Sequence, residues 1–318
     1  MATIRVGTRA SALALWQTER VRGILHAAGH PTERIEIRTT GDAILDVPLS
    51  QIGSRALFTK QLDDAMLEGR IDLAVHSLKD LPTNLPDGIA LGAVAMREDP
   101  RDALVCRMPG GSWGKLPAGG IVATSSLRRR AQLRALRPDL MVVDVRGNVD
   151  TRLNKLDANT DWSAILLASA GLVRLGFQDR ISERLTSDIM LPAPGQGALG
   201  VTLRIDDLRI RSLVHAALHD RDVGLATAAE RGFLRRLEGG CQVPVAALAT
   251  IASDRLALQG RVTALDGSRT SEGRHIATVR DDAEAAELGT ELAERLLREG
   301  AAEILAEVRG ENAAHGDA

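Results

Sequence analysis

The segment Ile121-Val122-Ala123-Thr124-Ser125-Ser126-Leu127-Arg128-Arg129-Arg130 contains the repeating unit of this fold. Its apolar residues predict a short buried strand, and the hydroxyl residues that follow predict the N-terminus of a helix. A strand that runs directly into a helix is half of a β–α unit, and the chain repeats this order several times. The sequence therefore predicts an α/β protein.

Other apolar runs end in polar residues in the same way. Alternating strands and helices favour mostly parallel sheets, in which ligands bind beyond the carboxyl ends of the strands. We therefore expect the polar residues to share the ligand-binding edge of a sheet. The runs and their polar endings are residues 3–7 with the helix cap Ser11, 71–75 with His76 to Asp80, 141–145 with Arg146 to Asn148, and 164–168 with Ser169.

Two connectors divide the chain. Arg97–Asp102 is charged and contains Pro100, which predicts a hinge. Pro192–Gly197 is a second connector, and residues 199–204 then predict a strand that returns to the first domain. A length of 318 residues suits two or three domains. We expect an α/β domain 1 at 1–98 and 197–216, an α/β domain 2 at 99–196, and an α+β domain 3 at 217–318, frayed after residue 310.

Domain 3 shows a different pattern from the first two. A helix through Arg236 precedes a loop, and strands then alternate around the turn Asp266-Gly267. The expected strands are 245–251, 255–263 and 274–279, and a helix at 282–308 completes the domain.

Composition narrows the class of protein. A formal net charge of −2 argues against a general nucleic-acid binder. The chain has no run as long as a membrane span, and Met1–Gly7 lacks a basic region followed by a long apolar stretch. We expect a cytoplasmic protein without membrane contact, and two cysteines in different settings fit a reducing compartment.

Arginine is concentrated where strands end. Of 40 basic residues, only Lys60, Lys79, Lys115 and Lys155 are lysine, a total that genomic base composition explains at least as well as function. Position is more informative, because bidentate guanidinium groups after strands suit a carboxylate or phosphate ligand. A capping box would also explain the hydroxyls of Thr124 to Ser126, and a solvated helix face would explain one of the arginines 128–130. The arginines that follow strands are Arg9, Arg128, Arg129, Arg130, Arg146 and Arg152.

Asp80 is the candidate acid. It follows a buried strand, where an aspartate more commonly forms an Asx turn or a helix cap. At the ligand-binding edge it could instead stabilise a cation or exchange protons. The residues alone leave both interpretations open, whereas His76 is better explained as a structural histidine.

Cys241 is placed for access. Gly239 and Gly240 remove side-chain cover and Pro244 stops helix propagation, so the thiol should lie on a loop. It has no base among its sequence neighbours, which suits an attachment point better than a nucleophile. An incidental thiol in a capping loop is the alternative. Cys106 instead ends an apolar run that predicts a buried strand, where a cysteine acts as a small hydrophobe.

Taken together, these segments resemble the porphobilinogen deaminase (hydroxymethylbilane synthase) family over nearly the whole chain. The resemblance implies two domains like type II periplasmic binding proteins and a third, small α+β domain. The segments that carry it are Gly7–Arg9, His76–Asp80, Glu98–Ala103, Thr124–Arg129, Arg146–Val149, Pro194–Ala198 and Glu238–Pro244.

The resemblance also implies a chemistry. Family members carry a dipyrromethane cofactor in thioether linkage to the cysteine that matches Cys241. Four porphobilinogens are added one at a time with loss of ammonia, and hydroxymethylbilane is released by hydrolysis. The partners implied are porphobilinogen and the growing polypyrrole, with a monomeric protein and no metal site.

By this resemblance Asp80 is the catalytic acid. Phe58 matches a family aromatic that could stack on a pyrrole, although helix packing would also explain it. The chain departs from the family at Ala10, and at Gln51 and Arg55 in a loop at 46–60, which leaves the anion contacts of that loop open. The residues implied to bind cofactor or growing chain are Arg9, Ser11, Lys79, Thr124, Ser126, Arg128, Arg129, Arg146 and Arg152, with Ser77, Ser125, Gly147, Asn148, Arg174 and Gln196 as further candidates.

Two other functions are compatible with parts of the sequence. Two α/β halves with clustered arginines would suit a binding module for a small carboxylate. A cysteine-dependent hydrolase would need a partner for Cys241 among the seven histidines.

Overall fold

Three separate β-sheets organise the chain in the computed structural model, which describes residues 2–38, 59–237, 243–253 and 255–314. Two sheets have five strands and the third has three. Helices accompany every sheet. This arrangement confirms the predicted fold class of two α/β parts and one α+β part.

The first sheet is built from both ends of the α/β region. Its strands are β1 (Ile4–Thr8), β2 (Thr32–Glu36), β3 (Leu73–Ser77), β4 (Ile89–Arg97) and β10 (Ala198–Arg204), in the order β2-β1-β3-β10-β4. Its helices are α1 (Ala12–Ala27), α3 (Lys60–Leu67) and α7 (Leu208–Leu218). Strand β10 is antiparallel to both neighbours, whereas β1, β2 and β3 are parallel.

The second sheet repeats this plan. Its strands are β5 (Asp102–Cys106), β6 (Ile121–Ala123), β7 (Met141–Val143), β8 (Trp162–Ala168) and β9 (Glu183–Arg184), in the order β7-β6-β8-β5-β9. Its helices are α4 (Leu127–Leu136), α5 (Val149–Ala158) and α6 (Ser169–Arg174). Here β5 is the antiparallel strand. The prediction of mostly parallel sheets is confirmed, with one reversed strand in each.

Two crossover segments join these sheets and touch. Residues 98–101 lead from β4 to β5, and residues 185–197 lead from β9 to β10. The amide of Glu98 donates a hydrogen bond of 3.0 Å to the carbonyl oxygen of Gly197. Gly197 has a φ of +88°, and a Cβ atom there would overlap the carbonyl oxygen of Glu98. The predicted returning strand is confirmed, and the close contact of the crossovers requires glycine.

The third sheet is antiparallel. It comprises β11 (Val245–Ala252), β12 (Arg255–Thr263) and β13 (Thr270–Thr278), and it is accompanied by α8 (Arg221–Arg236), α9 (Asp282–Leu296) and α10 (Ala302–Ala314). The prediction of one helix at 282–308 is wrong, because a wide turn at Leu297–Ala301 interrupts it where Gly300 adopts a φ of +101°. Helix α10 continues to Ala314, past the point where we expected fraying.

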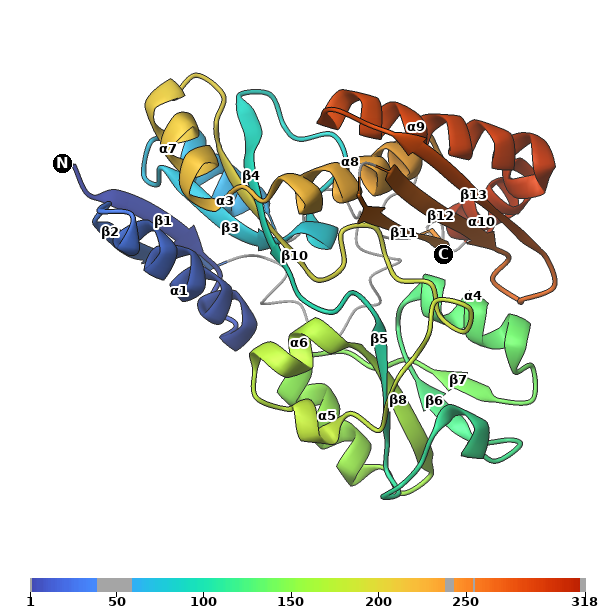
Figure 1. Cartoon of the computed structure of the whole chain (residues 1–318). Coiled ribbons are helices and arrows are strands. Elements are labelled where there is room, and N and C mark those ends of the chain that lie inside the picture. The colour runs from blue at the N-terminus through green and yellow to red at the C-terminus, as the bar shows by residue number, and fades with distance from the viewer. Residues whose placement is uncertain (1, 39–58, 238–242, 254, 315–318) are drawn as a thin grey trace.

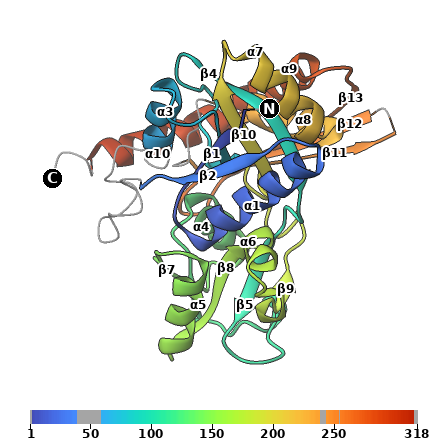
Figure 2. The ribbon, with the colours of Figure 1, turned by 90° about the vertical axis from the view of Figure 1, so that its left-hand side faces the viewer.

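Figure 1 shows the first sheet at the upper left, the second below it and the third at the upper right. Each part has its own cluster of buried apolar side chains, as separate domains require. In Figures 1 and 2 alike, α1 of the first part lies next to α6 of the second. The first two parts therefore meet along these helices as well as at the crossovers.

Helix α8 anchors the third part through a buried carboxylate. Glu230 is fully buried and accepts hydrogen bonds of 2.8 and 3.1 Å from the guanidinium of Arg97, at the end of β4. Its oxygens also accept hydrogen bonds from the amides of Gly195 and Ala249. One side chain thus ties together the end of β4, the second crossover and β11.

Candidate functional site

The segment after β3 carries the first group of candidate residues. His76 is buried, and its Nε2 lies 3.0 Å from the hydroxyl of Thr202 on β10. Burial lowers the pKa of His76 to about 4, and the charge of Arg9 acts in the same direction. A partnered histidine of this kind confirms the structural interpretation. Ser77 accepts a hydrogen bond of 2.8 Å from Nε2 of Gln17, which fixes it to α1.

Lys79 and Asp80 end a 3₁₀ turn at Leu78–Asp80. Nζ of Lys79 donates a hydrogen bond of 3.3 Å to Oε1 of Gln196 in the second crossover. Burial lowers the pKa of Lys79 to about 8, although the charge of Asp80 opposes this shift. The Asp80 side chain is exposed. An exposed carboxylate therefore stands beside a partly buried ammonium group.

The hydroxyl residues after β6 shape the start of α4. Ser126 caps the helix, because its Oγ accepts a hydrogen bond of 3.5 Å from the amide of Arg129. Its own amide donates one of 3.3 Å to Oγ1 of Thr124. Oγ of Ser125 donates to the carbonyl oxygen of Val145 at 2.8 Å and accepts from the amide of the same residue at 3.0 Å. The expected capping role is confirmed, and contacts of these hydroxyls to a ligand stay a prediction.

Arg128 and Arg129 converge on one buried carboxylate, Asp102, at the start of β5. Nη1 of Arg128 donates to Oδ2 at 2.7 Å, and Nε and Nη2 of Arg129 donate to Oδ1 at 3.0 and 2.7 Å. Gln196 adds a hydrogen bond of 2.9 Å. Burial alone would raise the pKa of Asp102, but the two arginines outweigh it and hold the pKa well below its ordinary range. Arg128, Arg129 and Asp102 together carry a net charge of +1, which would favour an anionic ligand.

Sequence reasoning did not identify Asp102 as part of the site. It is fully buried, and a buried carboxylate needs a cationic partner. Its place at the start of an apolar strand was the available signal. The identity of its partners was not visible, since they follow a different strand.

The loop before α5 and the first turns of that helix contribute one arginine each, Arg146 and Arg152. Nε of Arg152 donates a hydrogen bond of 2.7 Å to the carbonyl oxygen of Gly147, which has a φ of +113°. Asn148 is the exposed N-cap residue. Nη1 of Arg146 is buried and has no hydrogen-bond partner within the described part of the chain.

Residues of the first two parts lie close enough to act on one another electrostatically. Burial lowers the pKa of Arg152 to about 10, Arg129 adds to this effect, and the carboxylate of Asp80 opposes it. Arg128 and Arg129 likewise act on Lys79. Lys79 and Asp80 follow β3 of the first sheet, whereas Arg128, Arg129 and Arg152 lie on helices that follow strands of the second sheet. These residues therefore lie near one another, as one shared edge requires, and ligand binding at that edge stays a prediction.

Arg174 lies where the first two parts meet. It is 6% exposed, and its Nη2 donates a hydrogen bond of 2.6 Å to the carbonyl oxygen of Gly197. Its Cζ lies 5.5 Å from the ring centroid of Trp16 on α1, in range of a cation–π interaction. Burial lowers the pKa of Arg174 to about 10. Its Nε has no hydrogen-bond partner among the described residues.

Arg9 and Ser11 flank the start of α1. Oγ of Ser11 accepts a hydrogen bond of 3.4 Å from the amide of Ala14, as expected of an N-cap residue. Arg9 is half-buried at the end of β1. The predictions for Cys241, Phe58, Gln51 and Arg55 fall outside the described residues.

The donor set fits a ligand with several carboxylates. Buried polar groups normally have a partner, yet Nη1 of Arg146 and Nε of Arg174 have none in the described part. A carboxylate would give both a charge-assisted hydrogen bond. The same cations would disfavour a positively charged ligand.

Solved structures similar to this chain include bacterial substrate-binding proteins. The methionine binding protein MetQ has a TM-score of 0.42 and 13% identity, covering 68% of this chain and 89% of that one. A periplasmic substrate-binding protein from Coxiella burnetii has a TM-score of 0.43 and 15% identity, covering 72% of this chain and 97% of that one.

Across the described residues, the helices are all too short or too polar to cross a membrane.

Sequence comparison gives a closer relationship. Residues 4–212 match the family model "Porphobilinogen deaminase, dipyromethane cofactor binding domain", and residues 225–298 match "Porphobilinogen deaminase, C-terminal domain". The porphobilinogen deaminase of Geobacter metallireducens is 49% identical over 308 residues, covering 96% of this chain and 94% of that protein. That of Syntrophotalea carbinolica is 50% identical over 306 residues, covering 95% of each. The chain therefore belongs to the porphobilinogen deaminase family.

Proposed function

We propose that this protein joins four porphobilinogen molecules head to tail, with loss of ammonia, and releases hydroxymethylbilane by hydrolysis. The observation that carries the proposal is the set of hydrogen bonds through which Gln196 joins Lys79, the neighbour of Asp80, to Asp102, which in turn holds Arg128 and Arg129. Porphobilinogen bears an acetate and a propionate, which guanidinium groups bind well. Because the chain belongs to the porphobilinogen deaminase family, we do not propose the two alternatives, a carboxylate-binding module and a cysteine-dependent hydrolase.

The dipyrromethane cofactor supplies a covalently held primer on which the product is built. We propose Cys241 as its attachment residue, because a thioether needs an accessible thiol and no neighbouring base. Arg128, Arg129, Arg146 and Arg152 would hold its carboxylates and those of the growing chain. The buried Nη1 of Arg146 supports this assignment, because it has no hydrogen-bond partner among the residues that the structure describes.

Asp80 is proposed as the catalytic residue. It is an exposed carboxylate within a group of cations, so it can accept hydrogen bonds from pyrrole N–H groups. Its negative charge would stabilise positive charge that develops on the reacting ring. Lys79 and Gln196 would fix the turn that presents it, since they bond to each other at 3.3 Å.

The remaining candidates are proposed to complete the binding surface around these residues. Ser125, Ser126 and Thr124 shape the start of α4, and Gly147 and Asn148 shape that of α5. Arg9, Ser11 and Ser77 would line the side contributed by the first sheet, with Arg174 near the crossovers and Phe58 stacking on a pyrrole.

We further propose a cytoplasmic monomer with the domain boundaries expected from the sequence. The three sheets support that division, because each draws its strands from one of the expected domains. Sedimentation of the purified protein at several concentrations tests the monomer. A mass that rises with concentration would reject it.

The proposed activity is tested by incubating the protein with porphobilinogen and measuring ammonia and the linear tetrapyrrole. We expect four ammonia molecules per hydroxymethylbilane formed. Asp80→Asn should lower kcat by about a hundredfold or more, the range usual for loss of an acid–base group. Asp87→Asn, an exposed aspartate farther along the same loop, is the matched control. Wild-type turnover by Asp80→Asn would remove Asp80 from the mechanism, and a wild type without product would reject the function.

A further inference from the structure

A buried arginine of the third sheet reaches the helix that carries Arg128 and Arg129. Arg261 on β12 is 7% exposed, and Gln132 on α4 is 3% exposed. Nη1 of Arg261 donates a hydrogen bond of 2.7 Å to Oε1 of Gln132 and one of 3.4 Å to the carbonyl oxygen of Asp188. This contact between the third and second parts is shielded from water, so its hydrogen bonds are costly to lose.

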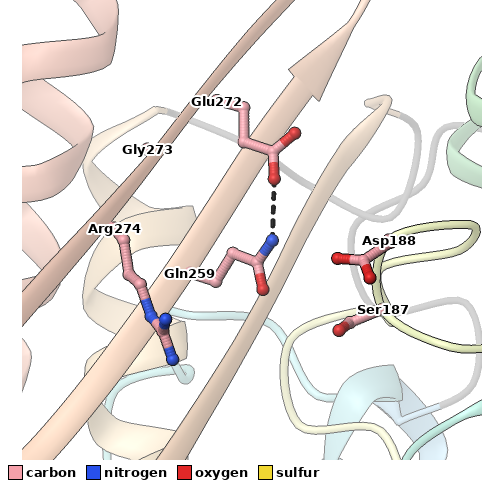
Figure 3. A pocket seen from close by; sticks show the side chains of 6 residues that line it. All are labelled: Ser187, Asp188, Gln259, Glu272, Gly273 and Arg274. Atoms are coloured by element: carbon pink, nitrogen blue, oxygen red, sulfur yellow. Dashed lines mark hydrogen bonds between the residues drawn. The ribbon is translucent and has the colours of Figure 1, made fainter.

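Glu272 on β13 fixes the direction of this guanidinium group. Nε and Nη2 of Arg261 donate to the two carboxylate oxygens of Glu272 at 2.8 and 3.0 Å. Nε2 of Gln259 donates a further hydrogen bond of 2.7 Å to Glu272, drawn in Figure 3. A bidentate pair sets the plane of the guanidinium group. The remaining nitrogen, Nη1, is therefore directed at Gln132.

A cavity of about 410 Å³ opens beside this contact. Figure 3 shows Ser187 and Asp188 on a loop of the second part, across from Gln259 and Glu272 on the third sheet. The two parts are not packed continuously here. Their alignment at this place therefore depends on the polar contact made by Arg261.

Gln132 links Arg261 to the arginines of the candidate site. Nε2 of Gln132 donates 3.0 Å to the carbonyl oxygen of Leu191, and Nη1 of Arg128 donates 2.8 Å to the same oxygen. The amide of Leu191 donates 2.9 Å to Oε1 of Gln132. Arg128 in turn holds Asp102. A displacement of Arg261 would therefore shift Gln132 and, through the carbonyl oxygen of Leu191, the guanidinium group of Arg128.

We infer that Arg261 is a positioning residue for the reaction, which holds the domain carrying Cys241 in a fixed relation to Arg128 and Arg129. The inference rests on the proposed function, which makes Cys241 the tether and these arginines the carboxylate ligands. Because a misplacement of about 1 Å can cost about a hundredfold in rate, the attachment point of the tethered chain and the arginines that bind it must be held in a defined relation. Arg261 supplies that constraint through Gln132 and does not itself bind the pyrroles.

The third domain should stay folded and attached when Arg261 is replaced, although its alignment with α4 is lost. Arg134 on α4 donates a separate hydrogen bond of 2.9 Å to the carbonyl oxygen of Leu265, and Glu230 keeps its bonds to Arg97. Replacement of Arg261 therefore loosens one contact among several. This makes a kinetic test practicable.

The test compares Arg261→Leu with Arg261→Lys and with the control Arg274→Leu, an exposed arginine that lines the same cavity. Intact-mass spectrometry gives the fraction of chains that bear the primer, and porphobilinogen consumption is expressed per primer-bearing chain. Arg261→Leu should lower kcat about five- to tenfold with KM changed less than about twofold, as expected for misplacement rather than weaker substrate binding. Arg261→Lys should recover at least half of the loss, and Arg274→Leu should behave as wild type.

Several results would overturn the inference. One is a kcat for Arg261→Leu within about twofold of wild type, whether or not its melting temperature falls, since a merely structural residue changes stability and not turnover per loaded chain. Another is an equal loss in Arg274→Leu. If Arg261→Leu does not fold, Arg261→Gln replaces it under the same criteria. A wild-type chain that never carries a primer would instead reject the proposed function, which separates the two failures.

Discussion

Asp102 offers the sharpest test of how the site is held together. Its carboxylate neutralises one of two arginines, and the side chains of Arg128, Arg129 and Asp102 are 5%, 6% and 0% exposed. In Asp102→Asn the shape is kept and the charge is lost. The amide oxygen can keep the three hydrogen bonds to Oδ1, but the NH₂ group then faces the donor Nη1 of Arg128. The substitution leaves two buried cations without a counter-charge.

The expected cost follows from this geometry. Removing one partner of a buried ion pair usually costs about 3–5 kcal/mol, a large part of the ~5–15 kcal/mol by which a domain is stable. We therefore expect Asp102→Asn to lower the free energy of unfolding by about 3–5 kcal/mol at pH 7. Because a lowered carboxyl pKa stabilises the fold above about pH 4, the difference should narrow as the pH falls below that value.

Urea unfolding followed by circular dichroism measures this difference. The matched control is Asp99→Asn, since Asp99 in the first crossover pairs with the more exposed Arg101 and Arg184. Its loss should cost about 1 kcal/mol or less. If Asp102→Asn also costs less than about 1 kcal/mol, the cluster is not held by its charge and the reasoning is refuted.

Three further substitutions test other parts of the structure. Burial raises the pKa of Asp63 to about 6 and one of its oxygens has no partner among the described residues, so its ionisation destabilises the fold as the pH rises from about 4 to 6. Asp63→Asn should raise the free energy of unfolding at pH 7 by about 1–3 kcal/mol, and no gain in urea titrations at pH 7 would contradict this. Glu230→Gln should cost about 3 kcal/mol by leaving Arg97 without its counter-charge, and a loss below about 1 kcal/mol in the same assay would argue against it as an anchor. Gly197→Ala should cost about 1–3 kcal/mol, because its positive φ and its contact with Glu98 exclude a side chain, and an unchanged melting curve would show that the crossovers can separate freely.

The local pattern of apolar and polar residues predicted most strands and helices. It did not predict features that depend on pairing between distant segments. The apolar run at 71–75 and the cap at Ser11 carry their own signals, so β3 and α1 were found. The reversed direction of β5 and β10 has no local signal, because it depends on crossovers between two sheets. The break at Gly300 was missed because an isolated glycine does not reveal whether a helix tolerates it.

The same distinction holds for the candidate site. The position of Asp80 and of the arginines after strands predicted their meeting at one edge. Asp102 and Arg261 were missed as site residues because their roles arise from partners elsewhere in the fold. Arg261 and Gln132 are separated by 129 positions in the sequence. Such pairs become visible when the domains are assembled.

The intact mass of the purified chain shows whether Cys241 holds the primer. Wild type and the control Cys106→Ser should each carry the added mass of two porphobilinogen units less two ammonia molecules. Cys241→Ser should have the mass of the bare polypeptide and no turnover. An unmodified wild type, even after incubation with porphobilinogen, or a full adduct on Cys241→Ser, would contradict it.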